Sequence, residues 1–240
     1  MKFISTLIFA LALAVKAGAA VWYLDASATG GANKGTNWAN AWTATTNVVW
    51  GGSGVKSGDT LTIAGGYYTN NGLSVGASGN SSNWIRIEAS RESGHNSKVV
   101  LKSISLGGNQ WIWITGAKDT NFPLPYPGAL RTNLALLTNN IGLQISHPDQ
   151  GATSQGIYVN GASGANQLVE WTEFGPIGAD VDTNAWDCFG IRFLNITTNG
   201  NWTIRGNWFH DIKNDDINLN AITGQNPGTF DATVIEHNYL

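Results

Sequence analysis

Short runs of alternating apolar and polar residues recur at coil-sized intervals in the last third of the chain. One set of runs leads with Ile157, Ile191 and Ile217, which are 34 (191 − 157) and 26 (217 − 191) residues apart. Repeats of roughly 20–50 residues built from strands are typical of solenoids, in which each repeat buries its inner face against its neighbours. The chain is therefore predicted to be an all-β protein made of stacked coils.

A second set of runs alternates with the first along the chain. Its aligned aliphatic residues are Val169, Ile204 and Ile235, which are 35 (204 − 169) and 31 (235 − 204) residues apart. Earlier segments with the same period-two alternation are expected to be further strands. These are the strand within Ser57–Tyr68, and Trp84–Glu88, Lys98–Leu101 and Gln110–Ile114; a short cap is predicted near Thr36–Val49, and loops at Asn121–Thr132 and Gly175–Asp187.

The first residues have the pattern of a secretory signal peptide. Lys2 precedes an apolar run over Phe3–Val15, and Ala17-Gly18-Ala19 has the small-residue pattern of a cleavage site. Residues 1–19 are therefore predicted to be removed on export, and residues 20–240 to be the N-terminal part of a β-helix domain. We expect a secreted protein, extracellular or periplasmic, without a membrane span; an uncleaved N-terminal anchor is the alternative.

The amino-acid composition limits the cellular compartments and the binding partners that we expect. Charged residues make up only 12% of the chain and glycine supplies 30 of its 240 residues, which suits a secreted β protein rich in turns. The net charge of −3 and the lack of a basic stripe make nucleic acid an unexpected partner. Cys188 is the only cysteine, so no disulfide within the chain can staple the coils.

The last residues repeat an earlier coil. Asn238-Tyr239-Leu240 falls where Asn207-Trp208-Phe209 stood one coil before. Because a solenoid needs a polar cap over its final coil, we expect that the chain continues into a longer protein, or that self-association covers this end.

Several segments resemble the right-handed parallel β-helix proteins of the pectate-lyase-like group. Ser57–Tyr68, with Gly58-Asp59-Thr60 and Gly65-Gly66, resembles the opening element of that group, and Gly206-Asn207 is similar to its repeat, in which stacked Asn side chains bond between coils. The resemblance implies a right-handed single-stranded parallel β-helix over about residues 23–240. Members of the group are mostly extracellular polysaccharide lyases, glycoside hydrolases, epimerases and adhesins, so the fold leaves the activity open.

Acidic residues precede two of the predicted strands. Asp215 and Asp216 lie before Ile217, Asp187 lies before Ile191, and a 35-residue register aligns Asp180 with Asp215. Coils stack about 4.8 Å apart, so carboxylates of successive coils can converge on Ca²⁺, which prefers oxygen ligands. Asp and Asn are also ordinary turn formers, which is the alternative interpretation of this cluster.

The acidic cluster is most similar to that of family-9 polysaccharide lyases, which bind Ca²⁺ through an Asp on one coil and an Asp-Asp-x-x-Asp run on the next. Carried over by position, Asp187 matches the first ligand and Asp215 and Asp216 match the pair. The last position of the run is Leu219, and Asn218 beside it can supply an amide oxygen. The resemblance thus implies a Ca²⁺ site at Asp187, Asp215, Asp216 and Asn218.

The leading hypothesis is a Ca²⁺-assisted lyase that cleaves an acidic, uronate-containing polysaccharide by β-elimination. A Lys on a later coil is the base in those lyases; within this chain Lys213 is the nearest cation, and His210, beside Asp211, is a candidate acid, base or sugar contact. Two alternatives remain. One is a non-catalytic adhesin or glycan-binding surface protein. It would use tryptophans that alternation within strands turns outward, with Trp111, Trp113, Trp202 and Trp208 as candidates. The other is an inverting glycoside hydrolase with Asp187 opposite Asp215 or Asp216.

Overall fold

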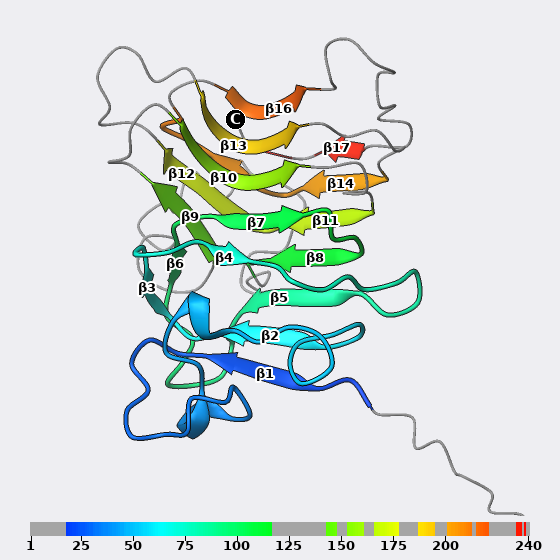
Figure 1. Cartoon of the computed structure of the whole chain (residues 1–240). Helices are drawn as coiled ribbons and strands as arrows, with labels where there is room; N and C mark the ends of the chain where they lie inside the picture. Colours follow the sequence, from blue (N-terminus) through cyan, green and yellow to red (C-terminus); the bar gives the residue numbers. More distant parts are fainter. Residues whose placement is uncertain are drawn as a thin grey trace, which may run out of the picture.

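The computed structural model describes residues 18–116, 143–147, 153–160, 166–177, 187–194, 201–212, 215–220, 234–236 and 238 (Figure 1). Within these residues the chain forms β-strands and two short 3-10 helices, η1 (Trp38–Asn40) and η2 (Thr45–Asn47), and every pair of named strands is parallel. The prediction of an all-β chain with stacked strands is confirmed.

The strands form three parallel sheets, and the chain visits them in strict rotation from β2 onward (Figure 1). Sheet 1 contains β1 (Val21–Leu24), β2 (Thr60–Ile63), β5 (Ile85–Ala89), β8 (Ile112–Thr115), β11 (Gln167–Glu170), β14 (Trp202–Arg205) and β17 (Val234–Glu236). Sheet 2 contains β3 (Gly66–Tyr68), β6 (Val99–Leu101), β9 (Leu143–His147), β12 (Thr172–Ile177) and β15 (Trp208–Phe209). Sheet 3 contains β4 (Leu73–Ser74), β7 (Ile104–Gly107), β10 (Thr153–Asn160), β13 (Asp187–Leu194) and β16 (Asp215–Asn220).

The register of sheet 3 agrees with the first set of repeats. Ile157 pairs with Ile191, and Ile191 pairs with Ile217, so the three isoleucines occupy equivalent positions on neighbouring strands. Ile157 and Ile191 are fully buried and Ile217 packs against the same core. The spacing of 34 and then 26 residues therefore measures two turns of the chain with different loop lengths.

The second set of repeats is likewise aligned, but the runs that contain Val169 and Ile204 each span two sheets. Val169 pairs with Ile204 and Ile204 with Ile235 in sheet 1, as predicted. The run that contains Ile204 is divided into β14 and β15 at Gly206-Asn207. The positive φ of Gly206, 63°, bends the chain between the two strands. Sheet 2 arises from these bends.

Alternation within the strands fills the space between the sheets. In β5, Ile85, Ile87 and Ala89 are buried while Arg86 and Glu88 are half-buried on the other face. Each fully buried aliphatic side chain contributes about 1.5–3 kcal/mol. An inner row crosses sheet 1 from strand to strand through paired residues, all fully buried: Leu61, Ile87, Ile114, Val169 and Ile204.

Other expected elements have mixed outcomes. The cap predicted near Thr36–Val49 contains η1 and η2. The second predicted loop is too long at both ends, because β12 extends to Ile177 and β13 begins at Asp187. The loop at Asn121–Thr132 and residues 1–17 of the predicted signal lie outside the described residues. In the part of the chain that the structure describes, no helix is long and apolar enough to cross a membrane.

Candidate functional site

The chain turns sharply where it leaves sheet 1 for sheet 2, and we call this bend the sheet 1–2 corner. One residue, Trp171, separates β11 from β12, and two residues, Gly206 and Asn207, separate β14 from β15. Since Glu170 pairs with Arg205, Trp171 and Gly206 hold equivalent positions on successive coils. Polar and aromatic side chains of both sheets meet on the two sides of this corner.

An asparagine ladder fixes the inside of the corner. The Oδ1 of Asn207 accepts the N–H of Thr172 on the preceding coil at 3.0 Å, and its Nδ2 donates to the carbonyl of Val169 at 3.0 Å. Asn238 repeats both bonds one coil later, accepting from the N–H of Asn207 at 3.0 Å and donating to the carbonyl of Ile204 at 2.8 Å. The predicted bonding of Asn side chains between coils is confirmed.

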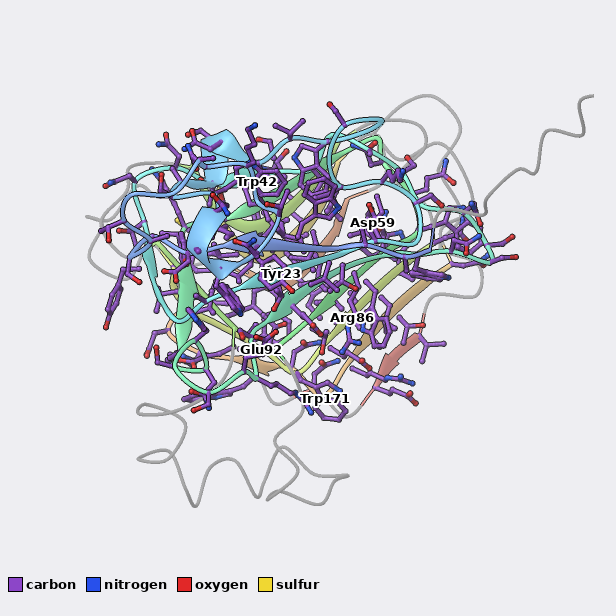
Figure 2. All side chains as sticks on the ribbon, turned by 90° about the horizontal axis from the view of Figure 1, so that it is seen from below. Tyr23, Trp42, Asp59, Arg86, Glu92 and Trp171 are labelled. Atoms are coloured by element: carbon purple, nitrogen blue, oxygen red, sulfur yellow. The ribbon has the colours of Figure 1, made fainter. Side chains whose placement is uncertain are left out.

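The outside of the corner is covered by the Trp171 ring. Trp171 has a φ of 54°, in the left-handed region that costs a non-glycine residue about 1–2 kcal/mol. Its ring lies over Gly206 so closely that a Cβ at that position would overlap it. Figure 2, which looks at the molecule from below, places Trp171 at the outer edge of the described ribbon. Gly206 therefore has two roles: its positive φ allows the bend, and its lack of a Cβ leaves room for the Trp171 ring.

On the sheet 2 side, His210 lies in a cluster of charged groups. Its Nε2 is 3.1 Å from Oε1 of Glu173, and its Nδ1 is 2.9 Å from Oδ2 of Asp211. The other oxygen of Glu173 forms an ion pair with Nζ of Lys98 at 2.6 Å. The Trp208 ring stacks on the imidazole with centroids 4.1 Å apart. These five residues, Lys98, Glu173, Trp208, His210 and Asp211, are the His210 cluster.

The neighbouring carboxylates favour the charged form of His210. Burial alone would lower the pKa of the imidazole, but the hydrogen bonds to Glu173 and Asp211, together with their charges, outweigh burial and raise the pKa. With both ring nitrogens facing carboxylate oxygens, the imidazolium can donate on both sides. His210 is therefore better suited to act as a fixed cation than as a base.

On the sheet 1 side, two arginines flank a tryptophan and a buried glutamate. The guanidinium of Arg86 lies 4.3 Å from the centre of the Trp113 ring, and the indole N–H of Trp113 donates to Glu170 at 2.9 Å. Arg205 holds Oε2 of Glu170 at 3.0 Å. Arg86 and Arg205 keep 35% and 43% of their side chains exposed. We call Arg86, Trp113, Glu170 and Arg205 the arginine strip.

A second carboxylate lies beside the strip on β5. Glu88 forms an ion pair with Arg86 at 2.8 Å. Burial raises the pKa of the Glu88 carboxyl, and the positive charges of Arg86 and Arg91 oppose that shift only in part. Glu88 and Glu170 each pair with Thr115 in the register of sheet 1, so they lie two strands apart, about 9.6 Å between backbones.

The strip and the cluster meet at the corner. Glu170 belongs to the strip and Glu173 to the cluster, on either side of Trp171. Arg86 and His210 lie against the half-buried rings of Trp113 and Trp208. Arg205 shares the carboxylate of Glu170 with the indole N–H of Trp113. Guanidinium groups recognise carboxylates with directed hydrogen bonds, and indole rings stack against flat apolar faces. The surface thus offers cationic N–H groups and indole faces, while Glu88, Glu170, Glu173 and Asp211 balance the charge of the cations.

The predicted Ca²⁺ ligands lie on adjacent strands of sheet 3. Asp187 opens β13 and Asp215 opens β16, and the register pairs Asp187 with Thr153 and Asp215 with Phe189. The two aspartates are thus two residues out of step, about 8 Å apart between backbones. Asp180 was expected opposite Asp215, and that alignment is wrong because the loop before β13 is longer than the repeat suggests.

The remaining predicted ligands follow along β16. Asn218 pairs with Arg192, and Asp216 lies between the pairs formed by Asp215 and Ile217. Lys213 lies outside the described residues. Among the residues described, no group of three or more His, Cys, Asp or Glu side chains is placed to hold a metal ion. The Ca²⁺ site at Asp187, Asp215, Asp216 and Asn218 stays a prediction.

The tryptophans singled out by alternation have different places. Trp202 is fully buried, while Trp113 and Trp208 are half-buried on outer faces. Trp111 was expected within the strand Gln110–Ile114, but β8 begins one residue later, at Ile112. Trp111 has a φ of 60° and packs edge-on against Trp84. The idea of an outward aromatic platform therefore concerns Trp113 and Trp208, with Trp171 between them in the fold.

Sequence reasoning found His210 but none of its ion-pair partners other than Asp211. Lys98 and Glu173 are 75 residues apart (173 − 98), and Glu170 meets Trp113 across 57 residues. Placing Val99, Leu143 and Thr172 in one sheet 2 register would have brought Lys98 and Glu173 near each other. That register was hidden because the strands of sheet 2 are short.

No family model matches the chain, and no curated protein or solved structure matches it either.

Proposed function

We propose that this chain is an exported right-handed parallel β-helix that acts on an acidic polysaccharide. The rotation of the chain through three parallel sheets supports the coil. Crossovers between parallel strands of one sheet are right-handed in nearly all proteins, which favours that hand. The signal-like residues 1–19 favour export, to the extracellular space or the periplasm.

One observation leads to the ligand: the sheet 1–2 corner joins half-exposed arginines to indole rings. Arg205 extends from the same corner that Trp171 covers, and Arg86 lies on the Trp113 ring. A uronate residue offers a carboxylate to a guanidinium and a flat apolar ring face to an indole. Arg86 and Arg205 each pair with a glutamate but keep 35% and 43% of their side chains exposed. Their exposed N–H groups can take a ligand carboxylate as well, so we propose an acidic glycan.

The proposed reaction is β-elimination, in which a base removes the proton α to the uronate carboxylate and the 4-oxygen departs. A Ca²⁺ ion held at Asp187, Asp215, Asp216 and Asn218 would neutralise that carboxylate and acidify the proton. His210, held as a cation by Glu173 and Asp211, would hold substrate rather than take the proton. The lyases that the acidic cluster resembles use a Lys on a later coil as the base, and Lys213 is the nearest candidate within this chain.

The test is to incubate the full-length protein with uronate polymers and Ca²⁺ and to follow the ultraviolet absorbance of the new carbon–carbon double bond. Lyase activity on an acidic polymer and silence on a neutral one is expected. Arg205→Gln should weaken the action on acidic polymer at least tenfold. The matched control is Lys102→Gln, a cation between sheet 2 and sheet 3, which should leave it unchanged. Equal effects of both variants would contradict the proposed surface.

A non-catalytic glycan-binding protein is the second candidate. It is favoured because Glu170 and Glu173 are both engaged by neighbouring side chains, with only 7% and 12% of their side chains exposed, rather than open to act on a substrate. Binding to the acidic polymer without any product would support it. New reducing ends without the absorbance change would instead favour the inverting hydrolase proposed for Asp187 with Asp215 or Asp216.

A further inference from the structure

A carboxylate is buried at the N-terminal end of the coil with only neutral hydrogen-bond donors. Asp59, labelled in Figure 2, directly precedes β2. It is 1% exposed. Its Oδ2 accepts the indole N–H of Trp22 at 2.9 Å and the backbone N–H of Lys56 at 3.1 Å, and its Oδ1 accepts the backbone N–H of Ala20 at 2.9 Å. Among the described residues, no cationic side chain forms an ion pair with it. Burying a carboxylate without a charged partner is costly.

Ala20 is the residue that follows the predicted cleavage site at Ala17-Gly18-Ala19. Its nitrogen already lies 2.9 Å from Oδ1 of Asp59, and its carbonyl accepts the N–H of Thr60 at 2.9 Å. The register continues with Val21 opposite Thr60. Ala20 is thus fixed at the edge of sheet 1 by bonds on both sides of its backbone.

We infer that Asp59 is the binding site for the α-ammonium group that signal-peptide removal creates at Ala20. Hydrolysis of the Ala19–Ala20 bond by a signal peptidase adds the hydroxyl of water to the carbonyl carbon of Ala19. The Ala20 nitrogen takes the hydrogen of that water and, at neutral pH, the proton that the new carboxyl group releases. The neutral amide N–H of Ala20 that donates to Oδ1 of Asp59 thus becomes a positively charged ammonium group at the same nitrogen. The inference rests on the proposed export.

This ion pair exists only in the processed protein. In the precursor the Ala20 nitrogen is an amide, and Asp59 keeps its desolvation cost. After cleavage the pair holds β1, the edge strand of sheet 1, against the turn before β2. Removal of the signal peptide would thus stabilise the pairing of β1 with β2, because it creates the positive charge at Ala20 that pairs with Asp59.

The test is a cycle with four proteins, made from full chains that begin at Ala20. The Ala20 amine is either free or acetylated, because acetylation keeps an N–H donor and removes the charge. Position 59 is either Asp or Asn. With Asp59, acetylation should lower Tm by about 5–15 °C; with Asp59→Asn it should change Tm by about 2 °C or less. Equal shifts in both backgrounds would reduce Asp59 to a turn former.

If Asp59→Asn does not fold, titration of the Ala20 amine in the Asp59 protein tests whether the ion pair forms. An amine paired with Asp59 should have a pKa above the ordinary α-amino value of about 7.7–8.0, measured by NMR on the protein that begins at Ala20. An ordinary pKa would overturn the ion pair. Sequencing of the exported protein separates the two proposals: a first residue other than Ala20 overturns the export step, whereas an ordinary pKa or equal Tm shifts overturn the pair alone.

Discussion

Two asparagine ladders cross sheet 1, one at each end of its strands, and they differ in burial. At the sheet 1–2 corner, Asn207 is fully buried and bonded to Asn238, Thr172 and Val169. At the opposite end, where strands of sheet 1 begin, the exposed Asn201 donates to Asn166 at 3.0 Å. The side-chain bond between asparagines is 3.0 Å long in both. Only the buried ladder satisfies backbone groups that water cannot reach.

The difference teaches that a repeated residue has a structural effect set by its surroundings. A buried N–H or carbonyl without a partner costs about 1–3 kcal/mol, whereas an exposed one turns to water. The residues that adopt a positive φ also differ between the two ends of sheet 1. Asn166 has a φ of 58° at the exposed end, which asparagine tolerates, while Gly206 adopts 63° under the Trp171 ring.

The largest effect is expected from Asn207→Ala. The change leaves the N–H of Thr172 and the carbonyl of Val169 without partners in the core, so the free energy of unfolding should fall by about 3–4 kcal/mol. Urea unfolding of the purified chain measures it. A loss below about 1 kcal/mol would show that the buried ladder is no more important than the exposed one.

Gly206→Ala should come next, with a loss of about 2–3 kcal/mol, because the new Cβ meets the Trp171 ring and the residue must keep a positive φ. Asn166→Ala is the matched control, because it also puts alanine at a positive φ but away from the Trp171 ring, and it should cost about 1 kcal/mol or less. Trp171 fluorescence should also shift in Gly206→Ala. Similar losses in both variants would mean that backbone conformation alone sets the cost.

The third effect depends on pH and concerns His210, on the sheet 2 side of the corner. Because the pKa of His210 is raised in the folded protein, its stabilising contribution is complete below the ordinary value of about 6.5 and is lost as pH rises through the folded pKa. Stability should therefore fall between mildly acidic and mildly alkaline pH by up to about 1 kcal/mol. In His210→Gln this fall should vanish, as judged by Tm across the pH series; an unchanged slope would contradict it.

The smallest effect is expected from Asn201→Ala. Its amide bonds at the surface, so the free energy of unfolding should change by about 0.5 kcal/mol or less. This variant is the reference for Asn207→Ala under identical conditions. A loss above about 2 kcal/mol would erase the distinction between the two ladders.

Some of the fold followed from residue patterns because strand alternation and repeat spacing are local. The alignment of Ile157, Ile191 and Ile217 and the bonding at Gly206-Asn207 were both predicted. The loop lengths could not be predicted, so the expected pairing of Asp180 with Asp215 was wrong. The predicted strand at Lys98–Leu101 contains β6 of sheet 2. That sheet 2 is separate from sheet 1 was not predicted, because its two- to six-residue strands show too little alternation.

By itself the sequence determined the all-β class, the repeat spacing and the residues that hold equivalent positions on neighbouring strands, since each depends on the period of residues along the chain. Only the tertiary structure decided which charges meet. Lys98 reaches Glu173, and Arg86 reaches the Trp113 ring, through strand pairing between coils. Burial decided the rest, because the same asparagine amide is a structural necessity inside the corner and a surface contact outside it.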